Sequence, residues 1–419
     1  MSLLSVFDEI VSIMHNDYAG IIEKNGCDKP ELYKEKLVAL EKENNLTREN
    51  FYDIVQEYLL DFKDKHISLI NKNKEVPQIT TGFKVRRFKD ALYITQITEE
   101  EKLKKGMKII SLDNKEIKEL AESNRNLLRS DIEEREDWDK VLLKHKSCLI
   151  EYDNQKIHFE FNLYPYKQAP SEYTLTKIQD KTLLLNINDF LDSNQLFELI
   201  EKNKNLIEES ENLIIDIRVN AGGSDTAYEP LLKDIFPPKS KIVLDGTLLY
   251  ITERNYNNRF KFINEWKKTL KNKEEVKQID QYLDELKNII NKGFVELEST
   301  KSQTIEFDGE LNPKKIIVLI DRYCGSSGDQ FALISSYSSK AKLIGRNTSG
   351  VIDYSNVAFE KFDDYGFDLM YPTTKSTRVI DGRGIDNIGV KPDIYIPWTP
   401  EHIDRDIDLE IALDYINRG

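Results

Sequence analysis

The sequence predicts an α/β fold for the larger, C-terminal part of the chain, preceded by a helical region and a smaller, mainly β domain. From residue 166 onward, short apolar strands alternate with stretches of helical spacing, a pattern typical of a buried sheet covered by helices. Residues 77–165 instead contain short strands separated by turns. Residues 1–76 carry apolar side chains at three- and four-residue steps. A length of 419 residues accommodates all three parts.

The composition is that of a globular protein and excludes several classes of partner. A net charge of -14 and an isoelectric point near 5.1 argue against a nucleic-acid partner. No uncharged apolar run is long enough to span a membrane. The first residues lack the features of a signal peptide, so we expect a cytoplasmic protein as the sequence stands, and an exported form with a removed leader stays open. The scattered Cys27, Cys148 and Cys324 predict neither a disulfide framework nor a zinc site.

One amphipathic helix stands out in the helical region of residues 1–76. Thr47 is its expected N-cap, and the apolar residues that follow it recur at helical spacing: Phe51, Ile54, Val55, Tyr58, Leu59 and Phe62. His66 lies four residues after Phe62 and continues the same face.

Residues 77–165 are expected to form a small β domain. Its predicted strands cover 81–85, 91–95, 107–111, 148–152 and 158–162. Around Gly106 and the Asp113-Asn114 turn, the segment resembles a PDZ domain, and this resemblance places the peptide-carboxylate loop at Gly82-Phe83. Met107 stands where that family usually has aspartate. A small β sandwich without a ligand stays open as the alternative.

The α/β part, residues 166–419, contains four apolar segments that predict strands of a buried sheet. They cover 182–187, 213–218, 316–320 and 341–345. A polar stretch near 250–300 carries apolar residues at helical spacing and predicts a helical insertion.

Paired serines lie at the junction between the predicted strand 316–320 and the helix that follows it. A small residue at this junction presents its hydroxyl at the edge of the sheet, where the free N–H groups of the first helical turn can stabilise an oxyanion. Ser326 is therefore a candidate nucleophile. By itself the motif favours a serine that caps a helix over a nucleophile.

A second motif ends the predicted strand 213–218. Residues 216–223 read Asp-Ile-Arg-Val-Asn-Ala-Gly-Gly. The glycine pair Gly222-Gly223 permits positive φ and the close approach of a ligand to bare amides. A tight turn without a ligand is the alternative.

Taken together with residues 345–350 and the Gly-Val-Lys-Pro-Asp phrase at 389–393, these motifs resemble the C-terminal processing (tail-specific) serine peptidases and their tricorn-core relatives. The resemblance implies a crotonase-like or ClpP-like core, endopeptidase activity on unfolded or C-terminal peptide segments, and no cofactor. It implies that Ser326 is the nucleophile and that the oxyanion hole consists of the N–H of Ser327 and an N–H of Gly222 or Gly223.

The resemblance also indicates the general base. Val351 stands where the Ser/Lys branch of that family has its lysine, so another group must accept the serine proton. Residues 64–68, Asp-Lys-His-Ile-Ser, resemble the phrase that carries the catalytic histidine of tricorn-like members, although Lys65 replaces a small residue. This makes His66 the base, and an imidazole suits that role. Asp386, in the position of a family glutamate, is the expected orienting acid, and a turn aspartate is its alternative.

The sequence thus predicts a serine endopeptidase with a Ser/His active site that acts on peptides or unfolded proteins. A catalytically silent peptide-binding protein of the same fold and a hydrolase of small esters are the competing hypotheses. The sequence does not indicate an oligomeric state.

Overall fold

The protein consists of two units, each assembled from three segments of the chain. The computed structural model describes residues 2–72 and 78–418. The first unit comprises Met1–Glu75, Val243–Ile305 and Val351–Asp386, and the second comprises Val76–Ile242, Glu306–Gly350 and Asn387–Gly419. This grouping differs from the three consecutive parts expected from the sequence. The helical insertion joins the N-terminal helices, and the β domain shares a unit with the buried sheet.

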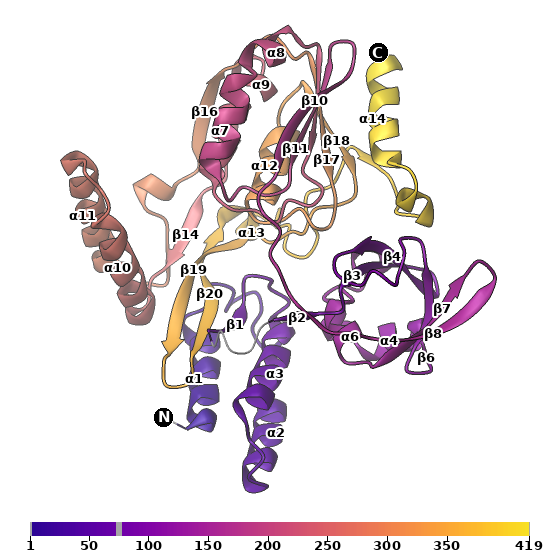
Figure 1. Cartoon of the computed structure of the whole chain (residues 1–419). Helices are drawn as coiled ribbons and strands as arrows, with labels where there is room; N and C mark the ends of the chain where they lie inside the picture. The colour runs from indigo at the N-terminus through magenta and orange to yellow at the C-terminus, as the bar shows by residue number, and fades with distance from the viewer. Residues whose placement is uncertain (1, 73–77, 419) are drawn as a thin grey trace. The chain divides into compact units, whose positions relative to one another are not determined.

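The first unit joins its three chain segments through one antiparallel sheet (Figure 1). The order is β1-β20-β14-β15, and β19 pairs with β20. The strands are β1 (Ser68–Asn71), β14 (Thr247–Tyr250), β15 (Phe294–Val295), β19 (Tyr354–Phe362) and β20 (Phe367–Ser376). Outside the helical insertion, the helices of this unit are α1 (Leu3–Asn16), α2 (Pro30–Lys42), α3 (Arg48–Leu59) and the short α13 (Thr377–Ile380). The pairing of β1 with β20 explains why residues 300 positions apart share a core.

The predicted helix after Thr47 is confirmed, but His66 does not continue its face. Thr47 caps α3, and its hydroxyl accepts the N–H of Asn50. The helix ends at Leu59 and is followed by a single turn of 3-10 helix. Lys63 then adopts a left-handed conformation with φ 48°, which stops helical propagation. His66 consequently lies in a turn between α3 and β1.

The predicted helical insertion is also confirmed. It consists of α10 (Glu253–Lys267) and α11 (Lys273–Asn288). The two helices share a small apolar core that includes Ile263, Leu283 and Leu286 and extends to Leu249 of β14.

The second unit contains a six-stranded sheet in the order β10-β11-β12-β17-β18-β21. Its strands are β10 (Tyr173–Gln179), β11 (Thr182–Ile187), β12 (Asn212–Asp216), β17 (Lys315–Ile320), β18 (Ala341–Gly345) and β21 (Ile394–Tyr395). All neighbours are parallel except the edge pair β10 and β11. The four strands predicted for this sheet are present, within two residues of the expected ends.

Helices cover both faces of this sheet, as Figure 1 shows. They are α7 (Ser193–Lys202), α8 (Lys204–Glu209), α9 (Glu229–Ile235), α12 (Ser327–Ser336) and α14 (Ile407–Arg418). Ala412 and Ile416 of α14 pack on Ile214 and Ile317 of the sheet. Burial on both faces accounts for the unbroken apolar sequence of β17. The loops that follow β12, β17 and β18 gather at the carboxyl edge of the parallel strands, where ligands of such sheets bind.

The β domain forms a separate antiparallel sheet within the second unit. The order is β3-β4-β5-β7-β8, and β6 pairs with β5. Its elements are β3 (Phe83–Phe88), β4 (Ala91–Ile97), β5 (Lys108–Leu112), β6 (Lys115–Glu116), β7 (Ser147–Tyr152), β8 (Gln155–Glu160), α4 (Ile117–Ser123), α5 (Arg125–Leu128) and α6 (Asp139–Leu143). The five predicted strands are present, with ends shifted by up to three residues. Two further strand pairs are β2 (Ile79–Thr80) with β9 (Tyr164–Pro165) and β13 (Pro238–Leu244) with β16 (Gln303–Asp308).

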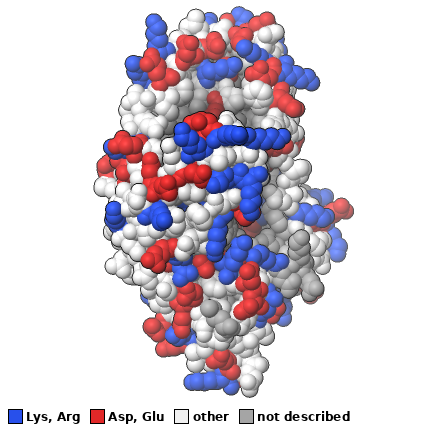
Figure 2. Space-filling view, turned by 90° about the vertical axis from the view of Figure 1, so that its left-hand side faces the viewer, with Lys and Arg blue, Asp and Glu red and all other residues white. Residues whose placement is uncertain are grey.

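The surface carries both signs of charge. On the face shown in Figure 2, Lys and Arg side chains are interspersed with Asp and Glu side chains. Within residues 2–72 and 78–418, none of the helices combines the length and the apolar composition that crossing a membrane requires.

Candidate active site

Ser326 occupies a strained turn between β17 and α12. Its backbone angles are φ 54° and ψ -122°, a combination that is costly for any residue except glycine. Such strain is typical of nucleophiles on a strand-turn-helix, because the sharp turn exposes the hydroxyl at the edge of the sheet. The predicted position of Ser326 at a strand-to-helix junction is therefore found, and the backbone strain is a feature that the sequence does not reveal.

Asp329 holds this turn. One carboxylate oxygen, Oδ2, accepts the N–H of Ser326 at 3.0 Å. The other, Oδ1, accepts the N–H of Gly350 at 2.9 Å. The side chain is fully buried, with 0% exposure. Asp329 therefore ties the nucleophile turn to the loop that follows β18.

The glycine pair lies directly against Ser326. A Cβ atom added to Gly222 would lie 2.6 Å from Cβ of Ser326, and Gly222 has φ +105°. Only glycine fits there. The hydroxyl of Ser327 donates to the carbonyl oxygen of Gly223 at 2.9 Å, which fixes the turn to the start of α12.

These contacts distinguish between the candidate oxyanion donors. The N–H of Gly222 donates to Oδ1 of Asn220 at 2.9 Å. The N–H of exposed Gly223 is consequently the better candidate of the pair. Ser327 is the first residue of α12, so its N–H has no acceptor within the helix. The N–H groups of Gly223 and Ser327 form the most suitable pair for an oxyanion.

Asn220 organises this half of the site, a role that the sequence does not assign to it. Its carbonyl oxygen accepts the N–H of Gly325 at 2.9 Å, and its side-chain nitrogen donates to the carbonyl oxygen of Ile187 at 3.2 Å. It is fully buried. One amide residue thus connects the end of β11 with the loops that follow β12 and β17.

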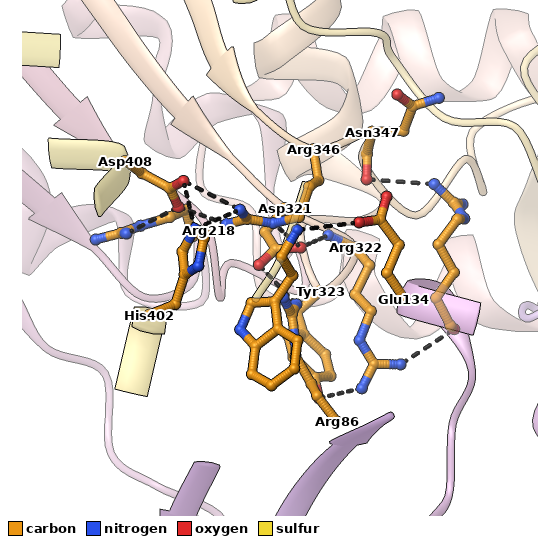
Figure 3. A network of polar contacts seen from close by, with 12 residues as sticks. Arg86, Glu134, Arg218, Asp321, Arg322, Tyr323, Arg346, Asn347, His402 and Asp408 are labelled. Atoms are coloured by element: carbon orange, nitrogen blue, oxygen red, sulfur yellow. Dashed lines mark hydrogen bonds and ion pairs between the residues drawn. The ribbon is translucent and has the colours of Figure 1, made fainter. Parts of the chain in front are cut away.

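A buried network of ion pairs fixes the end of β17, five residues before Ser326 (Figure 3). Asp321 pairs with Arg86 at 2.6 Å and with Arg346 at 3.1 Å. Arg346 also pairs with Asp408, which in turn contacts Arg218 at 3.2 Å. Burial alone would raise the pKa of Asp321, but the two arginines hold that pKa well below its ordinary value. The carboxylate is therefore ionised at neutral pH.

Two arginines connect the β domain to the loops of the site. Arg135 donates to the carbonyl oxygens of Thr348 at 2.8 Å and Ser349 at 3.1 Å. Arg322, four residues before Ser326, donates to the carbonyl oxygen of Arg135 at 3.0 Å. The loop after β18 is thus held by a side chain from the β domain and by Asp329.

His66 belongs to the first unit, where a main-chain carbonyl orients its ring. Nδ1 lies 2.8 Å from the carbonyl oxygen of Tyr354. A carbonyl oxygen only accepts, so Nδ1 carries the proton and Nε2 keeps its lone pair. The backbone N–H of His66 donates to Asp64 at 2.8 Å, and Asp64 accepts the hydroxyl of Tyr18 at 2.7 Å. This is the tautomer that a general base acting through Nε2 requires.

Asp386 also lies in the first unit, paired with Lys24. Nζ of Lys24 is 2.7 Å from Oδ2 of Asp386. Burial raises the pKa of Asp386 to about 6, while Lys24 opposes the rise. The structure identifies the Tyr354 carbonyl as a partner of His66 Nδ1, and the orienting role of Asp386 stays a prediction.

The predicted site residues fall into two groups. Ser326, Ser327, Gly222 and Gly223 lie together in the second unit, and His66 and Asp386 belong to the first. In the described part of the chain, no three His, Cys, Asp or Glu side chains are placed to hold a metal ion.

Comparisons with known proteins identify a family and similar folds. The sequence profile of Peptidase family S41 matches residues 181–396, just over half of the chain. A comparison with curated protein sequences gives no match. Mature CPAF in complex with lactacystin is similar in structure, with a TM-score of 0.68, 14% identity, and coverage of 99% of this chain and 97% of CPAF. A protein from Parabacteroides merdae ATCC 43184 has a TM-score of 0.51, 14% identity, and coverage of 99% and 96%.

Proposed function

The chain belongs to peptidase family S41 and is a serine-type peptidase, and from this premise we propose that it is an endopeptidase that forms an acyl-enzyme on Ser326 with His66 as general base. The observation that carries the proposal is the strained turn of Ser326, with the Gly222-Gly223 turn directly against it. A serine that merely caps a helix needs neither feature.

The chemistry follows from the roles of these groups. Nε2 of His66 accepts the hydroxyl proton as Oγ of Ser326 attacks the scissile carbonyl carbon. The N–H groups of Ser327 and Gly223 stabilise the negative charge that develops on the carbonyl oxygen. The imidazolium then returns its proton to the leaving amine as the C–N bond breaks. Water, deprotonated by the same imidazole, hydrolyses the ester and restores Ser326.

The choice of base rests on two observations. Val351 occupies the position at which a Ser/Lys enzyme of this family has lysine. His66 has its Nδ1 proton donated to the Tyr354 carbonyl, which leaves Nε2 as the basic nitrogen. Asp386 is assigned to support the imidazolium through its negative charge.

Two finer assignments belong to the same proposal. The sheet of parallel strands in the second unit is assigned to the crotonase-like or ClpP-like type, because its α/β order and the site at its carboxyl edge fit that type. The β domain of residues 77–165 is assigned as PDZ-like. The substrates are unfolded proteins or C-terminal peptide segments, as the tail-specific resemblance implies.

A fluorophosphonate probe tests the proposal. We expect the wild type to be labelled and Ser326→Ala to stay unlabelled, because the probe reacts with an activated serine. Lactacystin, which is bound in the CPAF structure, is a second probe for the same position. A wild type that neither probe modifies would instead support a silent peptide-binding protein.

Substrate turnover then separates the two hydrolase hypotheses. Cleavage of casein or of an unfolded peptide, lost in Ser326→Ala, supports the endopeptidase. Turnover of small esters with intact casein and peptides supports an esterase instead.

A further inference from the structure

The ammonium group of Lys24 connects the two segments that carry His66 and Asp386. Its side chain is only 10% exposed. Nζ forms the 2.7 Å ion pair with Asp386 and donates to the carbonyl oxygen of Lys63 at 3.3 Å. It also lies 5.2 Å from the centre of the Tyr354 ring, within cation-π distance. Lys24 therefore contacts three segments that are far apart in the sequence.

Each of these contacts lies next to a group that orients His66. Lys63 adopts the left-handed conformation three residues before His66. Tyr354 supplies the carbonyl oxygen that accepts the proton of Nδ1. Asp386 is the acid assigned to support the imidazolium. A single buried cation thus touches the turn of the base, the residue that holds its ring, and its assigned carboxylate.

We propose that Lys24 is a positioning residue for the peptidase reaction, and that its ammonium group holds the His66 turn and the Asp386 carboxylate in the arrangement that the base requires. The inference rests on the proposed function, because it assigns His66 as the base. Lys24 itself does not touch the reacting atoms.

The charge balance around Asp386 supports this role. Two neighbouring carboxylates, Asp64 and Asp353, raise the pKa of Asp386 in addition to burial. A carboxylate that is partly desolvated among other acids needs a cation to stay charged. Without Lys24, the pKa of Asp386 rises further, and its carboxylate is lost at a higher pH. The link from Asp386 through Lys24 to the carbonyl oxygen of Lys63 is lost as well.

Lys375 offers a matched control. It pairs with Glu23 at 2.6 Å, its side chain is 4% exposed, and its Nζ lies 3.9 Å from the centre of the Phe294 ring. Lys375→Met thus removes another largely buried lysine of the same unit, and the lost ion pair involves Glu23, the sequence neighbour of Lys24. Lys24→Met and Lys375→Met are expected to lose similar stability but to differ in catalysis. The reason is that Lys24 contacts the carbonyl oxygen of Lys63, three residues before His66.

The first measurement is the rate of fluorophosphonate labelling, with kcat and KM on a peptide. We expect Lys24→Met to lower the labelling rate and kcat by about 10- to 100-fold, with KM changed by less than about 3-fold. In Lys24→Met, the acid limb of the pH profile of kcat should move to higher pH. Lys24→Arg should retain most of the rate because it keeps the charge. The double variant Lys24→Met with Asp386→Asn should be no slower than the slower single variant, since the two side chains act as a pair.

The second measurement does not depend on activity. Nitrogen-15 NMR of the histidine rings, with His66 assigned from the His66→Ala spectrum, reports the tautomer. We expect a single Nδ1–H tautomer in the wild type and in Lys375→Met, and a mixture in Lys24→Met. An unchanged tautomer in Lys24→Met overturns the inference, as does an unchanged labelling rate. A wild type that the probe does not label overturns the proposed function instead, and the tautomer then decides the role of Lys24.

Discussion

The nucleophile region and the base region are built in opposite ways. Ser326 lies in one continuous strand-turn-helix that also contains its partner Asp329, and Gly222 approaches it from the loop that follows the neighbouring parallel strand β12. His66 lies in a turn without regular structure, held by Tyr354 almost 300 residues later and, through Lys63, by Lys24. The first region is specified by local geometry, and the second by tertiary contacts between distant segments.

This difference predicts how well each region should tolerate substitutions. The turn of Ser326 should tolerate no substitution at its central positions. A Cβ at Gly222 would displace Ser326, and a change at Ser326 alters the reacting atom itself. A base held by several separate hydrogen bonds loses function in steps as each bond is removed. Substitutions in the two regions can therefore test the comparison, from the largest effect to the smallest.

The largest effect is expected at the nucleophile. Ser326→Ala should lower kcat on the order of 10⁴-fold or more. Ser327→Ala should cost about 10-fold, because alanine keeps the backbone N–H and loses only the hydroxyl bond to Gly223. Peptide turnover with circular dichroism as a folding control measures both. Equal losses in two folded variants would contradict the assignment of Ser326.

The base should show a graded response. His66→Ala is expected to lower kcat on the order of 1000-fold, and Asp386→Asn by less, because the Tyr354 carbonyl still orients the ring in the latter. A pH profile of wild-type kcat/KM should fall on the acid side within about one or two units of the 6.5 reference value of histidine. The Asp386 carboxyl, with a pKa of about 6, protonates in the same range and should steepen that limb.

Two outcomes would contradict the assignment of His66 as the general base. Near-normal turnover in His66→Ala would require a different base. An acid limb at distinctly higher pH, retained in His66→Ala, would point to a desolvated lysine instead.

The contrast also marks what the sequence alone can predict. The strands β11, β12, β17 and β18 and the position of Ser326 follow from apolar runs and small-residue motifs, because both are local. Three features depend on loop geometry that composition does not encode. They are the hydrogen bonds by which Asp329 holds two loops, the strain at Ser326 and the contacts of Asn220. The carbonyl partner of the His66 ring was not predictable, since Tyr354 occurs in no recognisable motif. The expected continuation of the helical face to His66 failed because Lys63 turns the chain.

The buried ion pairs behind the nucleophile should govern acid stability. Asp321→Asn is expected to destabilise the protein by about 3–5 kcal/mol, because it leaves Arg86 and Arg346 buried without their shared carboxylate. The pKa of Asp321 and that of Asp408 are lowered on folding. Their stabilisation is therefore complete above the unfolded value of about 3.9 and is lost as the pH falls further.

Urea denaturation at a series of pH values measures this effect. Wild-type stability should drop steeply below about pH 4, and the drop should be shallower in Asp321→Asn. Lys72→Met, which removes the more exposed 2.7 Å pair with Asp368, is the control and should change stability little. Parallel pH curves for the wild type and Asp321→Asn would show that this network does not set acid stability.

The smallest effect is expected at the Gly82-Phe83 loop of the β domain, where the full chain should bind peptide carboxylates weakly or not at all. The N–H of Gly82 donates to the hydroxyl of Thr80 at 3.3 Å. Glu100, 1% exposed, lies beside the loop, and its backbone N–H donates to the carbonyl oxygen of Gly82 at 3.0 Å. Burial would raise the pKa of Glu100, but hydrogen bonds from Asn162 and Tyr164 lower it. An ionised carboxylate next to the loop repels a second one.

The measurement is a titration of full-length Ser326→Ala with matched peptides that end in a free carboxylate or an amide. We expect the two peptides to bind equally, with dissociation constants weaker than about 100 μM, since the N–H of Gly82 is already bonded to Thr80 and the loop faces a negative charge. Glu100→Gln, which keeps the size of the side chain and removes its charge, should restore some preference for the free carboxylate. Micromolar binding by the parent that requires the free carboxylate would show that this loop captures peptide ends despite Met107 and Glu100, and it would make the β domain a substrate receptor.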